Sequence, residues 1–181
     1  MDADGGNVRQ LTETPNASEH DAAWSPDGRH VAYDRAAITA DGTRRNAQLW
    51  IIDADGSNAR ALTSGSSRNM RPAWSPDGSI IAFMSDRHAE FDINVMGTDD
   101  GDLEIYVMKR DSSNTRRLTE CAGAASGPAW SPDGQRIAYN CNPYSHALHF
   151  EQLEICVIRA DGSEFRTLTQ NEVFDGHPDW W

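Results

Sequence analysis

Five charged or potentially charged residues stand just ahead of short apolar segments and could form a binding site. They are His20, Asp21, Arg71, His177 and Asp179. Imidazole and carboxylate groups ligate metals, and a guanidinium next to carboxylates binds charged groups of a ligand. The alternative is that these side chains are hydrated and only satisfy the ends of strands. The first interpretation requires the fold to bring distant segments together.

A second candidate is an acidic stretch that contains the sequence T-D-D-G-D. Asp99, Asp100 and Asp102 place short carboxylates around a glycine. Calcium takes six to eight oxygen ligands, so this stretch is a candidate calcium site. The twelve-residue calcium loop with its terminal glutamate is absent from it. The alternative is a solvated acidic loop without a cation.

A third candidate is S-H-A-L-H-F-E, which contains His146, His149 and Glu151 and lies close to Cys141 in the sequence. Zinc and similar metals take imidazole, thiolate and carboxylate ligands. Two histidines spaced in this way in a loop fix no ligand geometry, and no second closely spaced pair completes a tetrahedron. A loop without a metal is the alternative.

The chain has three cysteines, so at least one thiol is free if all pairing is internal. Cys121 follows an R-R-L-T segment and Cys141 ends the apolar segment after a proline turn, which places both toward one end of a sheet. A disulfide between them is the expectation, and it would fit an oxidising compartment. Two separate thiols are the alternative. Cys156 alternates within an apolar segment and is expected to be a small buried residue.

The elements that must position these residues repeat. W-S-P-D-G occurs three times, and Trp24, Trp74, Trp130 and Trp180 follow a period of roughly 50 residues. In S-P-D-G, proline presets the second turn position, serine and aspartate can bond the backbone, and glycine closes the turn. The turn therefore joins two antiparallel strands.

Each unit contains four short apolar segments, and the two longer ones are rich in β-branched and aromatic residues and too short for stable helices. They cover 31–33 and 49–52, 80–83 and 103–108, and 137–139 and 153–158. A short segment before each tryptophan and an L-T segment complete four strands, here called a to d in chain order. Repeated four-stranded antiparallel sheets of this length predict an all-β β-propeller.

The repeat resembles the blade of TolB-type propellers. The similarity rests on W-S-P-D-G, on R-I-A-Y or I-I-A-F after it, on S-D-R at 85–87, on L-E-I-Y-V-M at 103–108 and on R-R-L-T. The same repeat occurs in the propeller domains that cap prolyl-oligopeptidase-family enzymes. It implies a fold and leaves function open, because propellers carry many activities.

We expect residues 1–181 to be one propeller segment, with blades centred on 24–28, 74–78 and 130–134. A leading d strand over 8–12 and a trailing a strand over 178–181, the start of a fourth blade, are expected at the two ends. Propellers close with four to eight blades. Three blades therefore predict either a piece of a larger propeller or a ring shared between copies, of which six blades from a dimer is the simplest. We therefore expect either self-association of the chain or further blades of the propeller outside this segment.

A formal charge of −12 argues against nucleic acid and anionic membrane surfaces as partners, and no apolar stretch is long enough for membrane insertion. No signal peptide is visible, although the resemblance implies a periplasmic or extracellular cell-envelope protein. The sequence has no G-x-S-x-G, P-loop or H-E-x-x-H motif.

Strand order puts the S-P-D-G and D-A-D-G turns at one end of every blade. The d-to-a and b-to-c connections lie at the other end, and the b-to-c connections are expected to be long loops over roughly 34–47, 85–102 and 140–152. The loops at this second end vary in length and composition, and variable loops on a rigid scaffold are common binding sites. The leading hypothesis is a non-catalytic module that binds a protein or peptide there or in the channel. The alternatives are the substrate-gating propeller of a prolyl-oligopeptidase-type peptidase, and a metal-dependent hydrolase or lyase that uses His20 and His177.

Overall fold

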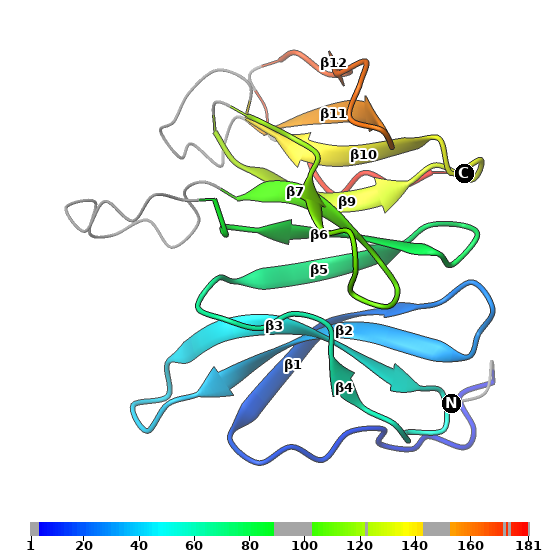
Figure 1. Ribbon diagram of the computed structural model, residues 1–181, viewed down its shortest axis with the longest axis vertical. Helices are drawn as coiled ribbons and strands as arrows, with labels where there is room; N and C mark the ends of the chain where they lie inside the picture. The colour runs from blue at the N-terminus through cyan, green and yellow to red at the C-terminus, as the bar shows by residue number, and fades with distance from the viewer. Residues whose placement is uncertain are drawn as a thin grey trace.

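The computed structural model describes residues 4–88, 103–121, 123–142, 153–171, 173 and 175–180. They form three antiparallel sheets of four strands, each paired in chain order, which pack face to face in a row (Figure 1). The chain is thus all-β and forms three blades of a partial propeller, as predicted. The strands are β1 Ala17–Trp24, β2 His30–Ile38, β3 Arg44–Asp53 and β4 Arg60–Ala61; β5 Asn69–Trp74, β6 Ile80–Ser85, β7 Glu104–Lys109 and β8 Arg116–Arg117; β9 Ala125–Trp130, β10 Arg136–Cys141, β11 Glu154–Arg159 and β12 Arg166–Thr167.

The S-P-D-G segments form the predicted turns. The Gly28 N–H donates to the Ser25 carbonyl at 2.9 Å, and Gly28 has a φ of 67°, which glycine adopts without a side-chain clash. The Asp27 carboxylate accepts from the Ser25 hydroxyl at 2.5 Å and from the Arg29 N–H at 3.0 Å. These bonds lower the pKa of Asp27. The aspartates are therefore turn residues, and Ser75 and Ser131 make the matching bonds.

Two connections differ from the sequence-based expectation. The first blade was expected to have a long loop over 34–47, but β2 and β3 continue as a hairpin that closes over 39–43. There the Thr39 N–H donates to the Thr43 carbonyl at 2.9 Å, and Gly42 has a φ of 81°. The reason is that A-D-G-T is turn chemistry between two segments able to pair. The expected strands over 8–12 and 178–181 are not strands in the part of the chain that the structure describes.

Side chains that alternate along the strands fill the space between neighbouring blades. Ile81, Phe83 and Met108 of the second blade pack on the first, and Ile137 and Tyr139 of the third blade pack on the second. These residues are buried, so each junction is a continuous apolar core. Burial at about 25 cal/mol per Å² of apolar surface makes these junctions the main stabilising contacts between blades.

The repeated tryptophan joins consecutive units. The indole N–H of Trp74 donates to the Ala23 carbonyl, that of Trp130 to Ala73 and that of Trp180 to Ala129, each at 3.1 Å. The first strand of one blade is thereby bonded to the first strand of the preceding blade. Trp24 holds the same position in the first blade and is 58% exposed, whereas Trp74 is 8% exposed.

Arginines of the L-T segments make the complementary connection. The Arg60 guanidinium donates to the Arg110 carbonyl at 3.3 Å, and that of Arg116 donates to the Ala160 carbonyl at 2.5 Å. In both cases a fourth-strand arginine reaches the turn between the third and fourth strands of the next blade. Arg9 makes the same contact with the first blade, through the Asp55 carbonyl at 2.8 Å and the Ala54 carbonyl.

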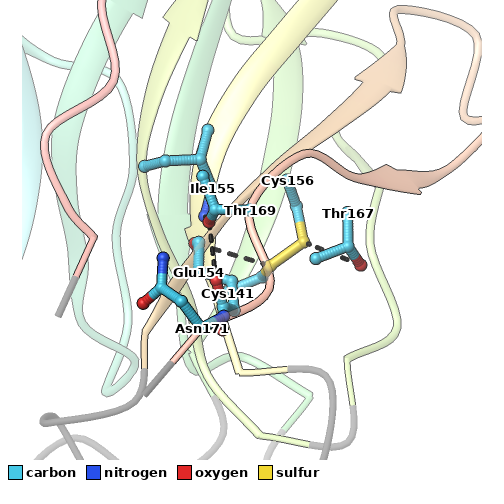
Figure 2. The surroundings of a disulfide bond; sticks show 7 residues. All are labelled: Cys141, Glu154, Ile155, Cys156, Thr167, Thr169 and Asn171. Carbon is cyan, nitrogen blue, oxygen red and sulfur yellow. Dashed lines mark hydrogen bonds between the residues drawn. A yellow bond between two sulfur atoms is a disulfide. The ribbon is translucent and has the colours of Figure 1, made fainter. Parts of the chain in front are cut away.

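The expected disulfide between Cys121 and Cys141 is wrong. Cys141 is bonded instead to Cys156, with their Cα atoms 5.9 Å apart, and Cys121 is free (Figure 2). Cys141 pairs with Glu154 across β10 and β11, so Cys156, two residues further, lies diagonally opposite on the same face. Strand pairing therefore brings these two sulfurs together, while Cys121 belongs to the loop that follows β8.

The remaining metal candidates, Asp99, Asp100 and Asp102 as well as His146, His149 and Glu151, lie outside the described residues. The calcium and zinc hypotheses for these stretches stay predictions. Within the described ranges, no helix is long and apolar enough to cross a membrane.

Candidate functional site

The first strand of each blade bulges at the same position, three residues before its repeated tryptophan, and His177 stands at this spacing before Trp180. Asp21, Arg71, Gly127 and His177 all have φ values between 50° and 61°. Pairing with the second strand shifts register across this position in all three sheets. A left-handed conformation is uncommon for residues other than glycine and costs on the order of 1 kcal/mol or more. Its recurrence marks a position at which the fold aims side chains away from the regular pleat.

The first strands lie on the side on which neighbouring blades approach each other most closely, because β1 packs beside β5 and β5 beside β9, whereas the fourth strands make no comparable contact in the described residues. The bulges are therefore on the side on which a propeller has its channel. Pro72, Pro128 and Pro178 follow three of the bulge residues, and proline has no N–H to leave unpaired at an inner strand edge.

Two of these left-handed residues, Arg71 and His177, are each tied to the preceding blade by a buried polar side chain of a second strand. The Asp34 carboxylate accepts from the Arg71 N–H at 3.4 Å, and the Asn140 carbonyl accepts from the His177 N–H at 3.0 Å. Asp34 and Asn140 are each 3% exposed. In β6 the equivalent position is occupied by Met84, whose side chain offers no comparable acceptor. The left-handed residue in the first strand of the next blade is Gly127.

Asp34 lies in a charged cluster built from the first two blades. His20 pairs with Asp34 across β1 and β2, and the Arg71 guanidinium lies 3.8 Å from the Asp21 carboxylate. Burial, followed by the neighbouring Asp21 carboxylate, raises the pKa of Asp34 to about 6, although the Arg71 N–H and His20 act in the opposite direction. Near neutral pH the cluster can exchange one proton with small changes in its surroundings.

The structure thus brings together three of the five predicted residues, His20, Asp21 and Arg71. Gly127 of the third blade lies beside this group: a Cβ there would lie 3.6 Å from Arg71 Nη1 and 3.5 Å from Asn140 Nδ2, both ordinary van der Waals distances.

The other two predicted residues lie beyond the third blade. His177 is exposed and held there by its backbone bond to Asn140, and the Asp179 carboxylate accepts from the Trp180 N–H at 2.8 Å. Among the described residues, no group of three or more His, Cys, Asp or Glu side chains is arranged to hold a metal ion. His20 and His177 are therefore not joined in such a set.

Sequence reasoning missed Asp34 and Asn140, the two residues that fix the bulges. A signal was present, because each directly follows a tyrosine at the end of a buried β segment, where an unpaired polar group would be costly. Their partners lie in another blade, more than 30 residues away, and could not be identified from the pattern.

A second set of buried polar groups holds the loops at the variable end of the blades. Glu104, 1% exposed, accepts from the Arg117 guanidinium and from the Cys121 N–H, each at 2.7 Å, and from the Thr119 hydroxyl. Thr119 in turn accepts from the Ile105 N–H at 2.9 Å. Glu104, the first residue of the third strand, thereby holds the threonine of the L-T segment and the loop that follows it. This set of bonds is called the clasp below.

The clasp recurs in the other blades with different chemistry. Glu154 accepts from the Thr169 hydroxyl at 2.6 Å and from the Asn171 N–H at 3.1 Å (Figure 2). In the first blade an amide replaces the carboxylate: Gln48 accepts from the Thr63 hydroxyl at 2.8 Å and donates to the Ser67 carbonyl at 2.7 Å. The repeated L-T threonines are explained by this role.

Comparison with known proteins agrees with this architecture. A family model described as the TolB beta propeller domain matches residues 22–103. The chain is 31% identical over 124 residues to the uncharacterized peptidase YuxL of Bacillus subtilis, covering 68% of this chain and 17% of that protein. It is 31% identical over 140 residues to the Tol-Pal system protein TolB of Anaeromyxobacter dehalogenans, covering 76% and 28%.

Among solved structures, the putative TolB from Agrobacterium tumefaciens superposes with a TM-score of 0.72 at 26% identity, covering 97% of this chain and 58% of that one. The chain thus spans about a quarter or less of the two relatives above and somewhat more than half of this structure.

Proposed function

We propose that this chain, which is built of TolB-like β-propeller repeats, is a non-catalytic binding module whose channel side and loop end recognise a protein or peptide partner. The observation that carries the proposal is the recurrent bulge, which presents His20, Asp21 and Arg71 on the inner strands. The Arg71 to Asp21 distance of 3.8 Å is longer than a hydrogen bond, and both side chains are more than a third exposed. Their donors and acceptors are available to a ligand.

The similarity to TolB supports a partner that is a protein, because the matched relative is named as a component of the Tol-Pal system. A periplasmic or extracellular location follows by the same resemblance, and the disulfide between Cys141 and Cys156 fits an oxidising compartment.

The test is selection of binding peptides from a random library with the whole chain as bait, followed by calorimetry on the selected peptides. Exchanging the charges, Asp21→Arg with Arg71→Asp, should weaken binding at least about tenfold, the effect of losing charged contacts. Arg29→Ala and Gln135→Ala, at exposed positions of the opposite turn end, serve as controls and should leave affinity unchanged. Equal affinity of the charge-exchanged variant and the controls would refute the proposal.

The second candidate function is the propeller of a prolyl-oligopeptidase-type peptidase, which gates access of substrates. It is favoured by the similarity to YuxL, a protein named as an uncharacterized peptidase, of which the matched stretch covers 17%. An α/β-hydrolase domain encoded in the same reading frame decides between the two functions.

We further propose that additional blades, from the rest of a longer polypeptide or from a second copy, cover the two open faces. Trp24 and Arg166 occupy the positions that form bonds between blades elsewhere, and both are exposed. Phe165, Leu168 and Val173 add exposed apolar surface at the third blade. Light scattering tests the shared ring: a mass near 40 kDa, twice the 20.0 kDa of the chain, supports a dimer, and 20.0 kDa refutes it.

A further inference from the structure

A pocket of about 560 Å³ lies between the outer strand of the second blade and the third blade, away from the channel-side cluster. One wall is formed by β8 and the loop behind it, including Leu118 and Cys121. The other is formed by Tyr139, Ile158 and Phe165. Ligand pockets in proteins usually measure roughly 300–1,000 Å³, so the size suits a small molecule.

The deep end of the pocket holds polar groups that remain uncharged. Tyr139 is fully buried, and Cys121, beside it, is half-buried. Burial, reinforced by the Glu104 carboxylate, raises the pKa of Cys121 to about 12, and burial also raises the pKa of Tyr139. Glu104 itself is paired with Arg117. The ionic groups nearest to this end are thus already neutralised by each other.

One hydrogen-bond donor at this end lacks a strong acceptor. Within the part of the chain that the structure describes, the Tyr139 hydroxyl is buried without a hydrogen bond of standard geometry, and it interacts with the neighbouring Cys121 thiol, which is a weak acceptor. A buried hydroxyl without a strong partner is unfavourable, so the site gains free energy when an acceptor reaches it. The second blade has no such donor, because Phe83 occupies the position of Tyr139 and stacks on Tyr106 with ring centroids 5.9 Å apart.

We propose that this pocket binds a small neutral ligand that carries one hydrogen-bond acceptor oxygen on an apolar body. The acceptor bonds the Tyr139 hydroxyl, and the apolar body packs on Leu118, Ile158 and Phe165. An anion is disfavoured, because Arg116 and Arg117 are engaged with the Ala160 carbonyl and with Glu104, while Glu120 and Asp161 add negative charge to the lining.

The proposal is tested by an NMR titration of the isotope-labelled full chain with acetanilide, a neutral aryl amide. The amide signals of Leu118, Cys121 and Gly162 should shift with a Kd of ~1 mM, as expected for about ten non-hydrogen atoms. Benzoate, of similar size but charged, should bind at least about tenfold more weakly, because its desolvation has no free cation to offset it. Failure of acetanilide to shift these signals at about 10 mM, or equal binding of benzoate, overturns the proposal.

Two variants assign the contacts. Tyr139→Phe keeps the ring that the second blade uses and should weaken acetanilide about fivefold, the usual loss for one neutral hydrogen bond. Phe165→Ala, at a position 50% exposed, should weaken it by a similar factor without endangering the fold. Leu168→Ala, at an equally apolar and 58% exposed position that does not line the pocket, is the matched control and should bind normally. Unchanged binding in both pocket variants refutes the site.

Discussion

The second and third blades have the same strand register and differ in the side chains that hold their strands together. At matched positions of β6 and β7, Ser85 bonds Asn69, and Arg87 lies 4.8 Å from the ring centroid of Tyr106. In β10 and β11 the positions of Ser85 and Tyr106 are taken by Cys141 and Cys156, which form the disulfide. The difference shows that one backbone unit tolerates covalent or non-covalent cross-strand connections, provided that the core face stays filled.

The clasp also uses different side-chain chemistry in the second and third blades. Glu104 has a charged partner, Arg117, as well as its threonine and backbone donors, whereas the donors to Glu154 are all neutral among the residues that the structure describes. The second blade therefore depends on a nearly buried ion pair, and the third blade depends on a disulfide.

The largest expected effect comes from Glu104→Ala. It leaves the Arg117 guanidinium and the Cys121 N–H without their acceptor, and breaking a buried ion pair should cost about 4 kcal/mol of unfolding free energy. Glu154→Ala removes neutral bonds only and should cost about 2 kcal/mol. Urea unfolding of both variants measures the difference. Equal costs would show that the Arg117 pair adds nothing to the clasp.

The disulfide should contribute somewhat less. Cys141→Ser with Cys156→Ser opens a link between residues 15 apart and should cost about 3 kcal/mol, mainly through the entropy of the unfolded chain. A reductant should lower the stability of the natural chain to that of the double variant and leave the variant unaffected. If the reductant lowers the stability of both proteins equally, the loss of stability does not come from the disulfide.

Asn140→Met gives the third blade the residue that the second blade has at Met84. The His177 N–H then loses its acceptor, which should cost about 1 kcal/mol. Hydrogen exchange at the His177 amide should accelerate about fivefold, while exchange in β6 stays unchanged. An unaltered rate at His177 would mean that this bond does not hold the segment in place.

Asp34→Asn extends the comparison to the first blade by giving it the third blade's amide. The pKa of Asp34 is raised in the folded chain, so stability from this residue is complete below pH 4 and is lost as pH rises through about 6. The variant should be more stable than the natural chain at pH 8, by on the order of 1 kcal/mol, with no gain at pH 4. Thermal unfolding at the two pH values checks this, and a gain of equal size at both would contradict the pKa argument.

The sequence predicted the repeated features because their chemistry is local. W-S-P-D-G forms its turn from bonds within six residues, as at Ser25 and His30, and the strands follow from short β-branched and aromatic segments. It also singled out His20, Asp21 and Arg71 but placed them ahead of the first strands, whereas the structure has them within β1 and β5. The hairpin over 39–43 was missed because its turn residues were taken for part of a loop.

The sequence by itself thus determined that the chain is all-β and that it is built of three four-stranded blades. Only the tertiary structure decided that Cys141 pairs with Cys156, that Asp34 and Asn140 hold bulges in other blades, and that a pocket lies beside Tyr139. The physical reason is that turns and strand type depend on neighbours in sequence. Partner choice depends on which faces meet after the sheets pack, and no local pattern encodes that.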